Sequence, residues 1–306
     1  MVVPPFFVKI IVVMNGLIIV NQTIGHNQYK IDRFKEEFSK RNIKLDVFVN
    51  DGTLAVIENS EVRINLPKAD FVFYLDKDIY LARLLEKAGY RLFNKADFIK
   101  LCDDKMLTFI ECSNRGIRMP KTASGPLVYT DLEESNYKFL DEIVKEIGLP
   151  MVVKKVYGSL GEGVYLVKNK EELKELYSSI YRNPIIFQEY IDSSYGQSIR
   201  VLIIDGKVFG SFIRKNNGDF RSNFGDTASS KTLVNPAKYD GFAQEIADKL
   251  HIEYAGIDIL LYKNEEPILC EINSNAFFEE FEKVTGLNVA SAIMDMVIRK
   301  VEHEQE

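Results

Sequence analysis

The chain has 306 residues, of which 46% are hydrophobic and 27% are charged. This is the composition of an ordinary globular protein that is long enough for two or three domains. The formal net charge of -6 argues against non-specific binding to nucleic acid or to an anionic membrane, because both would repel the protein. We therefore expect no nucleic-acid partner and no membrane partner.

The chain has three cysteines and three histidines, and neither set has the spacing of a metal site or a catalytic triad. An odd number of cysteines also fits a disulfide framework poorly, so we expect reduced thiols and a cytoplasmic protein. The chemistry must then depend on carboxylates, lysines, arginines and bound ions.

Residues 2–20 are strongly apolar, as in a signal peptide or a membrane span. However, the segment contains two prolines, Lys9 and Asn15, and no small-residue cleavage site follows it. A membrane span also needs about 20 apolar residues in a row. We predict buried sheet strands instead, starting near Phe7.

The first third of the chain alternates between strand-like and helix-like segments. Runs of β-branched residues predict buried strands, and apolar residues spaced three or four apart predict helices. The predicted strands are residues 7–13, 45–49 and 69–75, and the predicted helices are residues 29–40 and 79–87. This alternation indicates a small α/β domain. No G-x-G-x-x-G motif follows its first strand, so a dinucleotide site there is unsupported.

Helices and strands continue through the rest of the chain. We predict helices over residues 103–115, 139–147, 171–181, 236–250 and 289–301. We predict strands over residues 151–154, 164–167, 185–191, 256–262 and 267–273, and within the β-rich segment 199–213. Asn235 is the predicted N-cap of its helix and Pro236 the first helical residue.

Two acidic residues near the end of the chain lie on neighbouring predicted strands. If the turn between these strands is centred between Asn264 and Glu265, Asp258 lies opposite Glu271, and Asn273 shares the face of Glu271. Two opposed carboxylates repel each other unless a cation lies between them. Mg²⁺, with Asn273 as a neutral oxygen ligand, fits this arrangement. The alternative is a sheet edge on which both acids face water.

A glycine-rich segment, residues 158–163 (G-S-L-G-E-G), follows Lys154 at the end of a predicted strand. Glycines let backbone amides approach phosphate oxygens closely, and a nearby lysine adds positive charge. The segment is not a G-x-x-x-x-G-K-[ST] loop, so it is either a cover for phosphates or an ordinary turn. We call it the glycine loop. The strand ending in Q-E-Y-I (residues 188–191) either presents its backbone to an adenine ring or is an ordinary sheet strand.

The order of these segments resembles the ATP-grasp superfamily, and most closely its branch of RimK/LysX-like amino-acid ligases. The series is V-V-K, G-S-L-G-E-G-V, Q-E-Y-I, S-I-R, G-D-F-R-S-N, A-G-I-D-I-L and E-I-N, and the similarity runs from about residue 102 to 289. The resemblance implies an α/β protein with the ATP-grasp fold. Its parts would be a pre-ATP-grasp domain in residues 1–95, a central lid lobe in 96–188 and a C-terminal lobe in 189–306.

The resemblance also implies roles for individual residues. Positions that match nucleotide contacts are Lys105, Lys154, Gly158, Ser159, Gly161, Gly163, Gln188, Glu189, Tyr190, Ile191, Ser198, Arg221, Ser222 and Asn223. Positions that match catalytic contacts to phosphate and acyl phosphate are Arg200, Arg214 and Arg221. Asp258, Glu271 and Asn273 match ligands of one or two Mg²⁺ ions, with Mn²⁺ as a substitute.

The implied activity is ATP-dependent ligation of a carboxylate to an amine through an acyl phosphate. The acid and the amine are small molecules or peptides, and a protein or carrier-protein acceptor stays open. The resemblance further implies a homo-oligomer, either a dimer or a tetramer. Two other functions stay open: a phosphotransferase on the same scaffold and a non-catalytic nucleotide-binding module.

The sequence departs from the family pattern at two places. Ser198 stands where relatives often carry an aspartate that contacts ribose. After Asn273 the chain continues with S-N-A-F-F, whereas RimK has a Pro-Gly turn. We therefore expect differences in ribose contact and in the acceptor, but not in the metal ligands.

Overall fold

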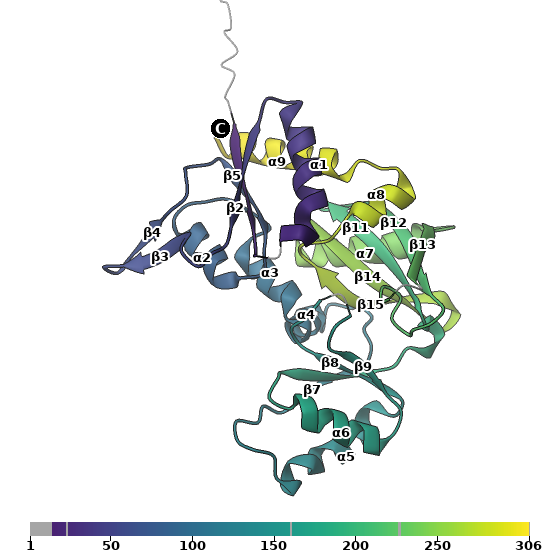
Figure 1. The fold of residues 1–306 in the computed structure, drawn as a ribbon. Helices are drawn as coiled ribbons and strands as arrows, with labels where there is room; N and C mark the ends of the chain where they lie inside the picture. The colour runs from purple at the N-terminus through teal and green to yellow at the C-terminus, as the bar shows by residue number, and fades with distance from the viewer. Residues whose placement is uncertain (1–13, 23, 160, 226–227, 306) are drawn as a thin grey trace, which may run out of the picture. The chain divides into compact units, whose positions relative to one another are not determined.

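The computed structural model describes residues 14–305 except residues 23, 160 and 226–227, so the strand predicted over residues 7–13 lies outside the described part. The chain divides into two compact units, residues 1–93 with 290–306 and residues 94–289 (Figure 1). The terminal helix thus groups with the N-terminal segment. The three-lobe division made from the sequence stays a prediction.

The first unit contains a parallel four-stranded sheet of order β2-β1-β5-β6. Its strands are β1 (Asn15–Val20), β2 (Lys44–Val49), β5 (Phe71–Leu75) and β6 (Leu92–Phe93), and its helices are α1 (Gln28–Ser39), α2 (Ile79–Lys87) and most of α9 (Val289–Gln305). A separate hairpin joins β3 (Ala55–Glu58) to β4 (Glu61–Ile64). Phe34 of α1 stacks on Phe73 of β5 with ring centroids 4.4 Å apart. The α/β character predicted for the first third of the chain is therefore confirmed.

The second unit begins with two short helices, α3 (Ala96–Asp103) and α4 (Lys105–Cys112), followed by a sheet of order β7-β10-β8-β9. The strands are β7 (Thr122–Ser124), β8 (Met151–Lys155), β9 (Val164–Val167) and β10 (Ile185–Glu189). Helices α5 (Lys138–Ile147) and α6 (Lys170–Ile180) supply Leu140, Leu173 and Tyr177 to the core of this sheet.

A second, antiparallel sheet of order β13-β12-β11-β14-β15 makes up the rest of this unit (Figure 1). Its strands are β11 (Gln197–Ile204), β12 (Lys207–Asn216), β13 (Ala228–Thr232), β14 (Tyr254–Tyr262) and β15 (Glu266–Asn273), and its helices are α7 (Ala237–Leu250) and α8 (Glu279–Thr285). Four 3-10 turns complete the described elements of the two units: η1 (Ile24–Asn27), η2 (Glu134–Tyr137), η3 (Asp192–Ser194) and η4 (Lys263–Glu265).

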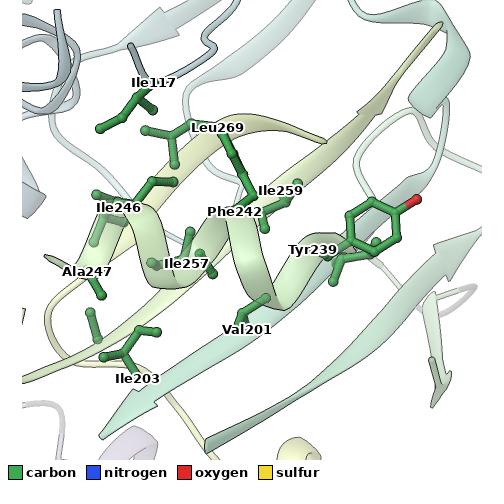
Figure 2. Close-up of a cluster of buried hydrophobic side chains, with 14 of the residues drawn as sticks. Ile117, Val201, Ile203, Tyr239, Phe242, Ile246, Ala247, Ile257, Ile259 and Leu269 are labelled. Atoms are coloured by element: carbon green, nitrogen blue, oxygen red, sulfur yellow. The ribbon is translucent and has the colours of Figure 1, made fainter. Parts of the chain in front are cut away.

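Strand alternation gives the five-stranded sheet one apolar face. Val201 of β11 and Ile257 of β14 are register partners and pack toward Phe242 and Ile246 of α7 (Figure 2). Side chains at alternate positions point to the opposite face. That opposite face is therefore where Arg200 and Asp258 lie.

Two predicted helix boundaries are wrong. Helix α7 begins at Ala237 with Pro236 at the N-cap position, and Asn235 has a φ of 57°, outside the extended region that an N-cap residue adopts. The helix predicted over residues 103–115 is broken at Asp104, which is extended and caps α4 by accepting the Leu107 amide at 3.0 Å.

None of the helices in the described residues is long and apolar enough to cross a lipid bilayer.

We expect Ile257→Ala to lower the free energy of unfolding by about 2–5 kcal/mol, because it opens a cavity in a fully buried position against α7. Urea denaturation followed by circular dichroism measures this loss. Ile57→Ala is the control: Ile57 is 71% exposed, and a change within about 0.5 kcal/mol is expected. Equal losses for the two variants would contradict the assigned core.

Candidate functional site

A pocket with a cavity volume of about 120 Å³ lies in the second unit. All the predicted nucleotide-binding residues except Gly163 line it, together with Asp258 and Glu271. The sequence analysis missed eight further lining residues: Val152, Glu162, Val164, Ser194, Gln197, Phe220, Leu260 and Cys270. Several of these are apolar, and apolar walls with a few polar groups are typical of small-molecule sites. Burial raises the pKa of the Cys270 thiol to about 11, so this thiol is neutral at pH 7.

Two lysines reach the pocket from different elements. Lys154 of β8 is buried and donates from Nζ to Oε1 of Gln188 at 2.6 Å. Gln188 in turn donates to Oγ1 of Thr122 at 2.9 Å. Lys105, the first residue of α4, donates from Nζ to the carbonyl oxygen of Gly158 at 2.9 Å. The glycine loop is therefore tied to α4 at its start.

The glycine loop is also tied to the segment of residues 218–225. Arg221 donates from Nη1 to the carbonyl oxygen of Gly161 at 3.0 Å. Nη2 of Arg221 donates to Oδ2 of Asp219 at 2.8 Å, and the centroid of the Phe224 ring lies 3.4 Å from Cζ of Arg221. Gly161 has a φ of 77°, and a Cβ there would lie 3.2 Å from the Phe224 ring, so glycine is favoured at this position. The two segments meet at the wall of the pocket.

The predicted adenine and ribose positions also lie together. The amide of Glu189 donates to the carbonyl oxygen of Lys121 at 2.8 Å, which fixes the end of β10. Ser198 and Ser222 are both buried, and their hydroxyl oxygens are 2.5 Å apart. A neutral hydroxyl pair thus occupies the place where the resemblance implies an aspartate.

The register of β14 and β15 pairs Asp258 with Glu271, as predicted. Asn273 donates from Nδ2 to Oε1 of Glu271 at 3.0 Å. Strand β11 pairs with the other edge of β14 and places Arg200 opposite Asp258, which was not predicted from the sequence. Arg200 donates from Nε and Nη2 to the two carboxylate oxygens of Asp258 at 2.5 and 2.7 Å. A resident guanidinium therefore balances the charge of Asp258.

Burial alone would raise the pKa of Asp258, because it disfavours the charged form. The attraction and hydrogen bonds of Arg200, with a contribution from Arg214, outweigh burial and lower that pKa below its ordinary value. Asp258 is therefore an anion at neutral pH although it is only 5% exposed.

Asp258, Glu271 and Asn273 offer two carboxylates and one amide. Among the residues that the structure describes, no group of three or more His, Cys, Asp or Glu side chains is placed to hold a metal ion. Hard oxygen donors suit Mg²⁺, which commonly takes one or two carboxylates and completes its shell with water and substrate phosphates. The donor set therefore fits Mg²⁺, and the three residues stay predicted ligands.

Arg200, Arg214 and Asn273 do not line the pocket. All three residues adjoin the pocket through Asp258. Arg200 bonds its carboxylate, and the nearest nitrogens of Arg214 and Asn273 lie 3.5 and 3.4 Å from the carboxylate oxygens of Asp258. Gly163 does not line it either, but has a φ of 71° and accepts the Lys155 amide at 2.8 Å, which shapes the glycine loop. The catalytic roles implied for the arginines stay predictions.

The fold is that of an ATP-grasp protein. Residues 102–297 match the model of the RimK-like ATP-grasp domain, and the chain belongs to this family. The family and the fold predicted from the sequence are thereby confirmed.

Named relatives and a solved structure agree with this assignment. Beta-citrylglutamate synthase B of Danio rerio is 30% identical over 260 residues, which is 82% of this chain and 62% of that protein. N-acetylaspartylglutamate synthase A of Homo sapiens is 32% identical over 234 residues, 75% of this chain and 58% of that protein. This chain therefore spans less than two thirds of the length of either relative. D-alanine–D-alanine ligase of Bacillus anthracis has the same fold, with a TM-score of 0.71, 19% identity and coverage of 95% of this chain and 99% of that one.

We expect Arg200→Met to lower the free energy of unfolding by about 3–5 kcal/mol at pH 7 with a chelator present, because it leaves Asp258 buried without its partner. In the variant, burial raises the pKa of Asp258, so protonation stabilises the variant as pH falls. The deficit relative to wild type should therefore shrink between pH 7 and about pH 4. Denaturant titrations at a series of pH values measure it.

Arg182→Met is the matched control, because Arg182 and Asp131 form an exposed ion pair at 2.7 Å. Its loss should be no more than about 1 kcal/mol. A deficit for Arg200→Met that stays constant with pH would contradict the assigned pair.

Proposed function

We propose that this protein is an ATP- and Mg²⁺-dependent ligase that joins a carboxylate to an amine through an acyl phosphate and releases ADP and phosphate. The observation that carries the proposal is that one pocket is lined both by Lys105 and Lys154 and by Asp258 and Glu271. Phosphoryl transfer is catalysed mainly by positioning and by neutralising charge on the phosphate oxygens. Membership of the RimK-like ATP-grasp family supports the same reading.

In this proposal the segment from Gln188 to Ile191 binds adenine, and the glycine loop covers the phosphates. The two lysines and Arg221 offset the negative charge of the transferring group. Asp258, Glu271 and Asn273 would hold one or two Mg²⁺ ions, or Mn²⁺ in their place, which neutralise phosphate charge when bound.

The reaction then has two steps. A substrate carboxylate oxygen attacks the γ-phosphorus of ATP, and ADP leaves with the electrons of the broken bond. The amine then attacks the acyl carbon, inorganic phosphate leaves, and the new amide nitrogen loses a proton. The hydrogen bond from Arg221 to Gly161 holds the glycine loop at the wall of the pocket.

The substrates we propose are small amino acids or peptides. The two named relatives are synthases whose products carry glutamate in their names, which supports a glutamate-like amine. A peptide, protein or carrier-protein acceptor, a dimeric or tetrameric assembly and a cytoplasmic location also belong to this proposal.

We expect Glu271→Gln to reduce ADP release by about 100-fold or more, because it removes a charged ligand from the ion site. The measurement is coupled-assay ADP release across a panel of amino acids and acids, with hydroxylamine to trap the acyl phosphate as a hydroxamate. Glu266→Gln on the same strand is the control, because Glu266 is a surface partner of Arg118 and Lys238. A Glu271→Gln rate near that of wild type would refute the ion site. ADP formed with a phosphorylated product and no amide would indicate a phosphotransferase instead.

We expect Lys154→Met to weaken binding of a non-hydrolysable ATP analogue about 10- to 100-fold. The change removes one charge-assisted hydrogen bond, which contributes about 1.5–3 kcal/mol. Isothermal titration calorimetry measures the affinity. Lys168→Met is the control, since Lys168 is exposed beyond the end of β9. The same affinity in both variants would show that the phosphates do not reach Lys154.

A further inference from the structure

Arg214 is a nine-tenths buried cation that shares its site with a second buried cation. Its side chain is 9% exposed, and that of Arg200 is 8% exposed. Both arginines contact Asp258, but Arg200 does so through two short hydrogen bonds, whereas Arg214 reaches it only at 3.5 Å. Both carboxylate oxygens of Asp258 are already bonded by Arg200. Arg214 therefore needs a carboxylate other than Asp258.

Glu280 supplies that carboxylate from α8. Its Oε2 accepts Nε and Nη2 of Arg214 at 2.9 and 2.7 Å, and its Oε1 accepts the hydroxyl of Ser230. Ser230 is the register partner of Arg214 on the edge strand β13. Both oxygens of Glu280 are thus engaged on the polar face of the sheet.

Glu280 does not depend on Arg214 alone for its position. The next residue, Phe281, is 1% exposed and packs edge-on against Phe212 of β12 with ring centroids 5.9 Å apart. This apolar anchor fixes α8 beside β12 and β13 (Figure 1). A side chain held by its own helix, by Ser230 and by Arg214 is preorganised, which is what a supporting residue of an active site requires.

We propose that Glu280 is a positioning residue: together with Ser230 it holds the Arg214 guanidinium beside Asp258 for the phosphoryl-transfer step. The inference rests on the proposed function for its catalytic consequence. Asp258 is also a predicted metal ligand, so its share in neutralising Arg214 decreases when it binds a cation. Glu280 is then the carboxylate that keeps Arg214 in place. Glu280 does not line the pocket, so we expect its replacement to affect catalysis more than nucleotide binding.

The test compares Glu280→Gln with Glu279→Gln, its neighbour in the same helical turn, whose carboxylate pairs with Lys283 on the surface. Glu280→Gln should lower kcat for ADP release about 10- to 100-fold and change the affinity for a non-hydrolysable ATP analogue less than twofold. Glu279→Gln should leave both at wild-type values. Ser230→Ala, which retains both charges, should lower kcat in the same direction and less.

A second readout does not need turnover. The ¹H–¹⁵N NMR signal of the Arg214 Nε–H group, identified by its absence in Arg214→Lys, should shift or broaden in Glu280→Gln and stay in place in Glu279→Gln. If wild-type protein releases no ADP with any acid and amine, the proposed function fails, and this signal still tests the positioning.

Two results would overturn the inference. The first is an unchanged kcat together with an unchanged Arg214 signal in Glu280→Gln. The second is a parallel loss of kcat, nucleotide affinity and thermal stability in both Glu280→Gln and Ser230→Ala, because that pattern indicates a purely structural role.

Discussion

The ion pair between Arg200 and Asp258 is the interaction on which the site depends. A carboxylate that is only 5% exposed is costly to bury, and it stays ionised here because a guanidinium bonds both of its oxygens. The pair joins β11 to β14 in the middle of the sheet, so the charge is fixed by backbone pairing and not by a mobile loop. Everything else on this face is arranged around that anion: Glu271 and Asn273 on one side, Arg214 and Glu280 on the other.

The same strands also build the core, because alternation sends neighbouring side chains to opposite faces. Ile199 and Val201 flank Arg200, and Ile257 and Ile259 flank Asp258, and all four are fully buried against the α7 side. Packing on the apolar face keeps the strands rigid. The side chains on the polar face of the same strands are therefore held in place as well. Charged groups on such strands can be held to a fraction of an ångström, which loops rarely achieve.

The order of the motifs along the chain was sufficient to predict the family. The pairing of Asp258 with Glu271 was also predicted correctly, but two errors that cancelled each other contributed to it. The turn was taken to be centred between Asn264 and Glu265, whereas Tyr262 pairs with Glu266, one residue short of the predicted partner. A bulge near Cys270 inserts one residue and restores the predicted register from Asp258 onward. A periodicity rule has no term for a bulge. The pair predicted from the turn was therefore correct because the unforeseen bulge offset the misplaced turn centre.

What the sequence could not give are contacts between elements far apart in the chain. Arg200 and Asp258 are 58 residues apart, and Arg214 and Glu280 are 66 apart, so no local pattern links them. Two opposed carboxylates require a cation, and only a metal ion was predicted for that place. Arg200 was not considered because its strand had no predicted partner. The structure shows that a guanidinium already meets part of that requirement. An ion that binds Asp258 must therefore compete with Arg200 or share the carboxylate with it. In the proposed function, metal binding at Asp258 is thereby linked to the contacts that Arg200 makes.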